Sequence, residues 1–433
     1  MSEAAPAAER PRTGKLGVFS WSVYDWANSP FTTVVTTFII ANYFSEAIAA
    51  NNTVGAAQWG FMQGAAALAI ALLSPVLGAI ADRGGRRKPW LAVFTILMIV
   101  GSAALWWATP ETGSTSIVLW ASAIGVIGFE VAIVFYNAML PGLVQESRIG
   151  RVSGWAWGLG YAGGLVCLII LLFVFVMPET APFGLDKSTA EHVRIAGPFV
   201  AIWTAVFCLP IFLFTPDTRG TGVPAGRAVR EGLAELWTTI VTIRQHRSIV
   251  RFLLARLFYI DGLNTIFAVG AIYAGAEFGM KTQDVIIFGI LLNVTAGLGA
   301  FAFGWIDDWI GAKPTILIAL VGVLTFGIPM LVIESSLWFY ILGGAIGLFF
   351  GPAQSASRSL MARLVPPGKE NEMFGLYAFS GKSTAFLGPW IFALVTTFAG
   401  HRWGMASVMP FLVVGALILL TVNTRKVDPD TVL

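Results

Sequence analysis

Five charged side chains lie inside long apolar runs of the sequence, namely Asp25, Glu130, Arg256, Asp261 and Lys382. At the centre of a membrane span such a charge costs roughly 2.5–3.5 kcal/mol, so it normally faces a polar interior or a partner. Acids and bases in this setting can hold a charged solute, exchange a proton or pair with one another. These residues are therefore the first candidates for chemistry in the chain.

Glu130 occupies the most central position of the five, 14 residues from Ser116 and 14 from Val144 at the ends of its apolar run. We expect it about 21 Å from either end of a helix. One interpretation is a protonatable carboxylate that couples transport to a proton, and the other is a protonated structural Glu bonded to a neighbouring helix. Any partner must come from another helix, and Lys382 and Arg256 are the available cations.

Two copies of an Asp-x-x-Asn pattern occur, Asp25 with Asn28 and Asp261 with Asn264. Residues three apart share one face of a helix, so each copy predicts a paired polar site. The alternative is a structural ion pair between Arg256 and either Asp25 or Asp261.

Arg256 and Lys382 are the basic groups deep enough to hold a substrate carboxylate, and Asn137 and Gln354 complete the set of substrate or coupling candidates. Arg358 lies nearer the end of its apolar run, which favours a gate or a topological role.

The composition indicates the class of protein that holds these side chains. Only 12% of the 433 residues are charged and 56% are apolar, whereas about 25% charged residues is usual in soluble domains; the mean hydropathy is +0.76. These values exclude a disordered chain, a coiled coil and a disulfide scaffold, and they predict an integral membrane protein. Cys167 and Cys208 lie in apolar runs without metal-ligand spacing, and the net charge of +3 is too small to suggest nucleic acid.

Twelve apolar runs are long enough for membrane helices, which need about 20 residues each. The first 17 residues are polar and show no cleavable signal. The predicted spans lie near 18–45, 58–82, 89–108, 116–144, 152–177, 197–215, 249–276, 283–307, 314–333, 336–363, 371–398 and 403–422.

The distribution of Lys and Arg predicts the orientation of these spans. With both termini inside, 21 basic residues fall in inside segments and 4 in outside loops. Basic residues concentrate on the cytoplasmic side, so both termini are expected there and the number of spans is even. We expect a multi-pass protein of the inner or plasma membrane.

The chain divides into two halves of six spans. The predicted segments are a tail (1–17), the N-terminal half (18–215), a cytoplasmic linker (216–248), the C-terminal half (249–422) and a second tail (423–433). The linker carries apolar residues at helical spacing, which predicts an amphipathic helix at the membrane surface. These residues are Val229, Leu233, Leu236, Ile240 and Ile243.

The two halves repeat one another, and three sets of residues match in the same order. The loop after span two aligns with the loop after span eight at an offset of 226, span one aligns with span seven, and spans four and five align with ten and eleven. Parallel repeats of six helices are typical of transporters with a site between the halves. The loop residues that match are Gly78, Asp82, Gly85 and Arg87 against Gly304, Asp308, Gly311 and Lys313.

The loop Gly78-x-x-x-Asp82-Arg83-x-Gly85-Arg86-Arg87 resembles the signature loop of the major facilitator superfamily. The segments Tyr24-Asp25-Trp26-Ala27-Asn28-Ser29 and Gly351-Pro352-Ala353-Gln354-Ser355-Ala356-Ser357-Arg358-Ser359-Leu360-Met361 resemble its vacuole effluxer-like branch, which contains fungal vacuolar amino-acid effluxers. The resemblance implies an all-α fold of 12 transmembrane helices, alternating access, and a central cavity lined by helices 1, 4, 7 and 10.

The signature loop has a mechanical interpretation. Asp82 can accept hydrogen bonds from a neighbouring helix N-terminus or pair with an arginine, which would hold the inner ends of the halves together. Gly85 permits a tight turn. The alternative is that this loop, with Arg86 and Arg87, serves only topology and headgroup binding. The residues assigned to this latch are Gly78, Asp82, Arg83, Gly85, Arg86, Arg87, Asp308 and Gly311.

We therefore expect a secondary transporter of a small polar solute, with an amino acid or similar zwitterion favoured and a proton as coupling ion. A proton-coupled sugar or drug carrier and a membrane sensor are the alternatives. An enzyme is disfavoured because the three His fall outside the spans, and ATP-driven pumping because no GxxxxGK[ST] loop occurs. We expect a monomer in the lipid bilayer that binds no cofactor, metal or nucleic acid.

Overall fold

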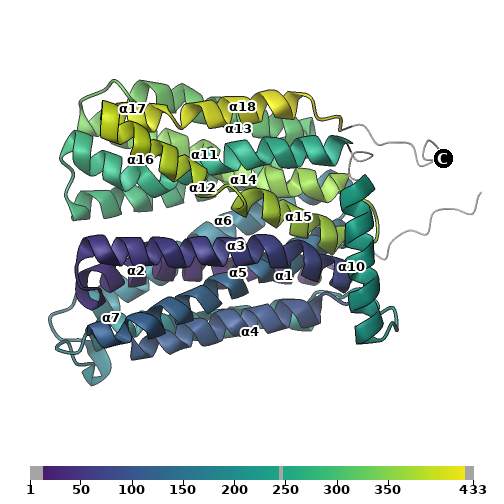
Figure 1. The fold of residues 1–433 in the computed structure, drawn as a ribbon, viewed down its shortest axis with the longest axis horizontal. Coiled ribbons are helices and arrows are strands. Elements are labelled where there is room, and N and C mark those ends of the chain that lie inside the picture. Colours follow the sequence, from purple (N-terminus) through teal and green to yellow (C-terminus); the bar gives the residue numbers. More distant parts are fainter. Residues whose placement is uncertain (1–12, 243–246, 425–433) are drawn as a thin grey trace, which may run out of the picture.

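The computed structural model describes residues 13–242 and 247–424, and every regular element in this part of the chain is a helix. Figure 1 shows most helices running along the long axis of the molecule in two layers. Helices α1–α9 form the N-terminal half, α11–α18 form the C-terminal half, and α10 crosses their ends. The end of the bundle that carries α10 is called the α10 end below.

The N-terminal half begins with a span assembled from α1 (Lys15–Pro30), a π-helical segment (Phe31–Phe38), α2 (Ile40–Tyr43) and a second π-helical segment (Phe44–Ile48). Pro30 and the π-helical turns bend this span, as prolines and π-bulges commonly do. The remaining α-helices of this half are α3 (Asn52–Gly84), α4 (Lys88–Ala104), α5 (Thr115–Leu143), α6 (Ile149–Ile170), α7 (Glu191–Arg194), α8 (Ala196–Phe207) and α9 (Leu209–Phe214).

The C-terminal half repeats this plan. Its elements are α11 (Arg247–Phe278), α12 (Thr282–Ile310), α13 (Ala312–Met330), α14 (Ser336–Leu364), α15 (Glu370–Lys382), α16 (Leu387–Ala399), α17 (His401–Ala406) and α18 (Met409–Leu420). Eleven helical segments of the described chain are long and apolar enough to cross a membrane. The remaining predicted span, 371–398, which is the eleventh in chain order, is instead two shorter helices, α15 and α16.

The break between α15 and α16 has a local cause in Gly388 and Pro389. Proline has no N–H, and its ring clashes with the carbonyl four residues earlier, so it interrupts a helix. Residues 383–386 form a turn at this point, and α16 restarts at Leu387. The break therefore lies about 18 Å from the α10 end, which is the length of α15 at a rise of 1.5 Å per residue.

The amphipathic helix predicted in the linker is α10 (Ala225–Thr242), but its packed face differs from the predicted stripe. Leu236 is buried, whereas Val229, Leu233 and Ile240 are exposed, and Ile243 lies outside the described residues. Gly232 explains the shift, because a Cβ there would lie 2.9 Å from the Cα of Ile80 on α3. The small residues of α10 therefore pack on the bundle, and its larger apolar residues face outward.

Glycines allow the two halves to approach closely at the α10 end. A Cβ on Gly375 of α15 would overlap the carbonyl of Ser74 on α3, and one on Gly154 of α6 would overlap the carbonyl of Ala300 on α12. Small residues let membrane helices pack with their backbones near one another. The two contacts, α3 with α15 and α6 with α12, are related by the repeat.

Candidate functional site

Asp82 joins the two halves at the α10 end. Its Oδ1 accepts from the backbone N–H of Asn371 at 3.1 Å and from the amide of that side chain at 2.6 Å. Its Oδ2 accepts from the N–H of Glu372 at 2.8 Å. These donors belong to the first turn of α15, where N–H groups lack intrahelical partners and the helix dipole favours a negative charge.

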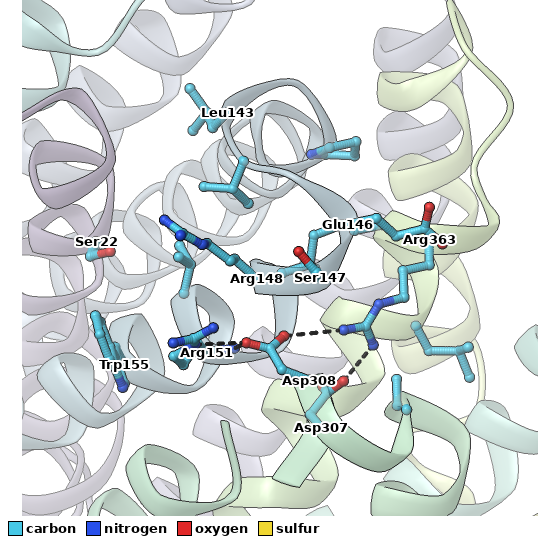
Figure 2. Close-up of a pocket in the computed structure, with 18 of the residues that line it drawn as sticks. Ser22, Leu143, Glu146, Ser147, Arg148, Arg151, Trp155, Asp307, Asp308 and Arg363 are labelled. Carbon is cyan, nitrogen blue, oxygen red and sulfur yellow. Dashed lines mark hydrogen bonds and ion pairs between the residues drawn. The ribbon is translucent and has the colours of Figure 1, made fainter. Parts of the chain in front are cut away.

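Asp308 makes the corresponding contact from the C-terminal half, on α12, to the N-terminal half, on α6. Its carboxylate accepts from the N–H of Gly150 at 2.8 Å and from the N–H of Arg151 at 3.2 Å, in the first turn of α6. Figure 2 shows the same carboxylate between the guanidinium groups of Arg151 and Arg363. Arg363 also pairs with Asp307, so this contact contains more charges than its counterpart at Asp82.

The other residues of the signature loop support these contacts. Gly85 and Gly311 end their helices with φ values of 80° and 95°, which residues with a Cβ rarely adopt. A Cβ on Gly78 would overlap the carbonyl of Asn371, so glycine lets Asp82 reach α15. Arg87 donates to the carbonyl of Ala138 at 2.6 Å.

Three pairs extend the contact between the halves at this surface. Arg87 lies 3.0 Å from Glu370 of α15. Glu235 of α10 lies 2.6 Å from Arg83 and 3.6 Å from Lys369, so α10 contacts both halves. Arg86 is exposed. These geometries place Arg83 and Arg87 in specific pairs, which a purely topological role would not require.

Deeper in the bundle, Arg358 of α14 forms a buried ion pair with Asp25 of α1 at 2.9 Å. Asp25 therefore pairs with Arg358 and not with Arg256; because Asp261 is not paired with Arg256 among the described residues either, the hypothesis that Arg256 pairs with one of these acids is wrong. Arg358 also donates to the carbonyl and hydroxyl of Ser153 and, at 3.4 Å, to Asn137. The sequence did not reveal this pair because Arg358 and Asp25 lie 333 residues apart.

Aromatic rings surround the same guanidinium. The Cζ of Arg358 lies 5.1 Å from the ring of Trp21, 5.5 Å from Tyr136 and 5.7 Å from Trp157. A cation over a desolvated aromatic face is attracted by roughly 2 kcal/mol. The pair therefore belongs to a compact plug made from α1, α5, α6 and α14.

Arg256 has a different environment from the one predicted. It donates to the carbonyl of Tyr377 at 2.7 Å and to the hydroxyl of Ser380 at 3.0 Å, and it lies 3.5 Å from the Tyr377 ring centre. Asp261 accepts one bond, from the N–H of Gly388 at 3.2 Å. Neither residue has an ion-pair partner among the residues that the structure describes.

The two Asp-x-x-Asn copies do not form equivalent sites. Asn28 is buried and accepts from Ser29 at 3.4 Å, whereas Asn264 is exposed. Gln354 is half-buried, and neither its side chain nor that of Asn264 forms a hydrogen bond within the described part of the chain. The predicted symmetry therefore fails, because one asparagine is enclosed by the bundle and the other is not.

Glu130 of α5 pairs with Lys382 of α15, and the Oε1 and Nζ atoms lie 2.6 Å apart. This pair joins the two halves near the middle of both spans, with Glu130 about 20 Å from the last residue of α5. Its side chains are 22% and 27% exposed, whereas Asp25 and Arg358 are 9% and 3% exposed. The mid-span pair is therefore the more exposed of the two.

A groove of about 2770 Å³ is lined by residues of α6 and α12, among others, and Figure 2 shows part of this lining beside the Asp308 contact. Trp155, Phe301 and Leu298 line its apolar part, and Arg148 lines its polar part. Neither Glu130 nor Lys382 lines it. The groove is therefore separate from the ion pair at mid-span.

We predict that Asp82→Asn weakens closure of the α10 end, because the amide presents a donor to the backbone N–H groups of Asn371 and Glu372. Losing hydrogen bonds to a charged group costs roughly 1.5–3 kcal/mol. Spin labels at positions 145 and 367 should report a larger open population, with slower transport and largely retained substrate binding.

The matched control for this variant is Asp186→Asn, since Asp186 is exposed and bonds within its own loop. An unchanged distance distribution in Asp82→Asn would contradict a latch and leave only a topological role for the loop.

Comparisons with known proteins agree with this arrangement. The family model described as vacuole effluxer Atg22 like matches residues 56–431. The uncharacterised MFS-type transporter YxiO of Bacillus subtilis is 29% identical over 405 residues, which cover 92% of this chain and 93% of that protein. Autophagy-related protein 22-1 of Neosartorya fischeri is 25% identical over 313 residues; the match covers 66% of this chain and only 50% of the fungal protein.

Solved structures show the same fold at low sequence identity. The proton:xylose symporter XylE is similar with a TM-score of 0.70 and 14% identity, over 94% of this chain and 96% of that one. The human organic anion transporter MFSD10 is similar with a TM-score of 0.69 and 14% identity, over 94% and 99%. With the paired halves, the repeated Asp contacts and the matched family model, the chain belongs to the Atg22-like vacuole effluxer family of major facilitator superfamily transporters.

Proposed function

We propose that this transporter carries a small zwitterionic solute, such as an amino acid, by secondary active transport with alternating access. The observation that carries the proposal is the Glu130–Lys382 ion pair, which joins the halves at mid-span and remains partly exposed. Substrate sites of secondary transporters lie near the bilayer midplane between the repeats.

A zwitterion suits this pair because it carries both charges that the pair contains. Its ammonium group can replace Lys382 at Glu130, and its carboxylate can replace Glu130 at Lys382, so neither charge is left without a partner at mid-span. A neutral sugar carries neither charge, so it cannot replace either partner of the Glu130–Lys382 pair.

Glu130 is also the proposed coupling residue. When Glu130 takes up a proton, Lys382 is released from the pair and can hold the substrate carboxylate alone. Proton binding at Glu130 and substrate binding at Lys382 then favour each other, because both depend on breaking the same ion pair. Coupled transport requires such a linkage. With the α10 end closed by the Asp82 and Asp308 contacts, alternating access predicts that the solute enters this site from the opposite side.

We predict that Glu130→Gln abolishes uphill accumulation and leaves substrate exchange across the membrane intact. The amide oxygen can still accept from Lys382, but the side chain can no longer release and rebind a proton. Accumulation and exchange should be measured in proteoliposomes with and without a pH gradient, using amino acids, sugars and nucleosides as candidate solutes.

Glu111→Gln is the matched control, because Glu111 is exposed and lies in the connection between α4 and α5. Normal accumulation by Glu130→Gln would show a structural role, and loss of binding itself would move Glu130 from coupling to recognition. A neutral sugar that is accumulated while amino acids are not would contradict the zwitterion proposal.

We further propose that the α10 end is cytoplasmic and that the protein resides in the cell membrane with both termini inside. The support is the count of 21 basic residues in inside segments against 4 outside. The exposed apolar residues of α10, with Trp237, suit the headgroup region of that leaflet.

The orientation predicts that a single cysteine at Gly222, in the connection before α10, resists impermeant thiol reagents added to whole cells. A cysteine at Ser188, in the loop at the opposite end, should react. Cys167 and Cys208 are buried and should not interfere. The reverse labelling pattern would overturn the orientation.

A further inference from the structure

The groove between α6 and α12 is much larger than a site for a small solute needs. Its volume is about 2770 Å³, whereas pockets for small ligands measure roughly 300–1,000 Å³. The groove lies apart from the mid-span pair of Glu130 and Lys382, which do not line it. Its size therefore suits a longer ligand, and its lining indicates which chemistry that ligand has.

The middle of the groove is apolar and faces outward. Leu298 and Phe301 of α12 are 60% and 47% exposed, and Trp155 of α6 stacks on Phe301 with ring centres 5.9 Å apart. Lipid tails are as apolar as leucine, so such a wall in a membrane span suits hydrocarbon. The apolar residues along the groove include Leu159, Ala162 and Leu165 on α6 and Val294, Leu298 and Phe301 on α12.

The apolar wall has the length of one bilayer leaflet. On α6 it extends from Val152 to Leu165, which is about 20 Å at a rise of 1.5 Å per residue. The hydrocarbon of one leaflet is about 15 Å deep, half of the 30 Å core. An acyl chain that begins at the α10 end can therefore lie along the groove to the bilayer midplane.

Cations without an ion-pair partner line the groove at the α10 end. They are Lys15, Arg148 and Arg247, which are exposed and form no ion pair within the described part of the chain. Figure 2 shows the Arg148 guanidinium apart from the carboxylates of Asp307 and Asp308. These cations are therefore available to a negatively charged group.

The acids that line the same groove do not offset these cations. Asp307, Asp308 and Glu370 are each paired with an arginine. Glu146 is exposed at the same rim, and Lys313 adds a further positive charge. The groove thus combines a positive end with a long apolar wall.

We propose that the groove between α6 and α12 binds an anionic glycerophospholipid. Its phosphate contacts Lys15, Arg148 and Arg247, and one acyl chain lies along the apolar wall. Basic pockets between membrane helices on the cytoplasmic side suit acidic headgroups, and the cytoplasmic leaflet supplies such lipids. Arg148 precedes α6 in the N-terminal half and Arg247 begins α11 in the C-terminal half, so the lipid contacts both halves.

Other occupants account for less of the groove. Inorganic phosphate would use the cations and leave the apolar wall uncovered, and a lipid without net charge would use the wall and leave the cations unpaired. Lipid binding is measured in detergent without any assumption about the transported solute or the orientation of the chain. Failure of this proposal would therefore leave the proposed function unaffected.

The test is native mass spectrometry of the purified, delipidated full-length protein in detergent. Dioleoyl phosphatidylglycerol is the anionic lipid, and dioleoyl phosphatidylcholine has the same chains without net charge. We expect saturable binding of phosphatidylglycerol with a Kd roughly tenfold lower than that of phosphatidylcholine. Excess inorganic phosphate at constant ionic strength should not displace it. Equal affinity for the two lipids, or displacement by phosphate, would overturn the proposal.

Arg148→Gln and Ala162→Trp locate the bound lipid. Arg148→Gln removes one charge and should raise the Kd for phosphatidylglycerol roughly fivefold, with phosphatidylcholine unaffected. Ala162→Trp keeps every charge but fills the apolar wall, so it should weaken the binding of phosphatidylglycerol as well. Ala162 is exposed, and its replacement tests the wall independently of the cations.

The matched controls are Arg230→Gln and Ala302→Trp. Arg230 is an exposed cation of α10, Ala302 is an exposed residue of α12, and neither lines the groove. Both controls should bind phosphatidylglycerol as the wild type does. An equal loss in the controls, or unchanged binding in both groove variants, would contradict the assignment. Binding that appears only after removal of residues 425–433 would show that the chain's own end fills the groove, which would also contradict it.

Discussion

Arg358 carries a charge that it does not lose in proteins, and its side chain is almost completely buried where the halves meet. Its ligands come from α1, α5 and α6 of the N-terminal half, while the arginine belongs to α14 of the C-terminal half. Separating the halves would remove all of these partners together. The closed arrangement is therefore a discrete state, and the Asp82 and Asp308 contacts reinforce it at the surface.

The polar contacts between the halves form three levels. The outermost uses helix N-termini, the next uses the Asp25–Arg358 pair, and the innermost uses the Glu130–Lys382 pair. Exposure distinguishes their roles: the middle level is dry, and the innermost is partly solvated. A dry pair seals one side, and a solvated pair can exchange its partner for a solute, which is the division of labour that alternating access needs.

The fold could be predicted from hydropathy and the internal repeat, because span length and repeated spacing depend on local sequence. The carboxylate contact of Asp82 was also foreseeable, since a helix N-terminus attracts an acid. The pairing of Arg358 was not, because it depends on how two halves dock. The break at residues 383–386 carried a local signal, Gly388 followed by Pro389, which apolar composition alone obscures.

A double-mutant cycle on Asp25→Asn and Arg358→Gln tests most directly whether one buried pair governs closure of the α10 end. The closed population is read from spin labels at positions 145 and 367. Each single variant should reduce the free energy of closing by roughly 3–5 kcal/mol, because it leaves one buried group uncompensated. The double variant should cost less than the sum, with a coupling energy of at least about 1 kcal/mol. Additive effects of the two substitutions would contradict the account.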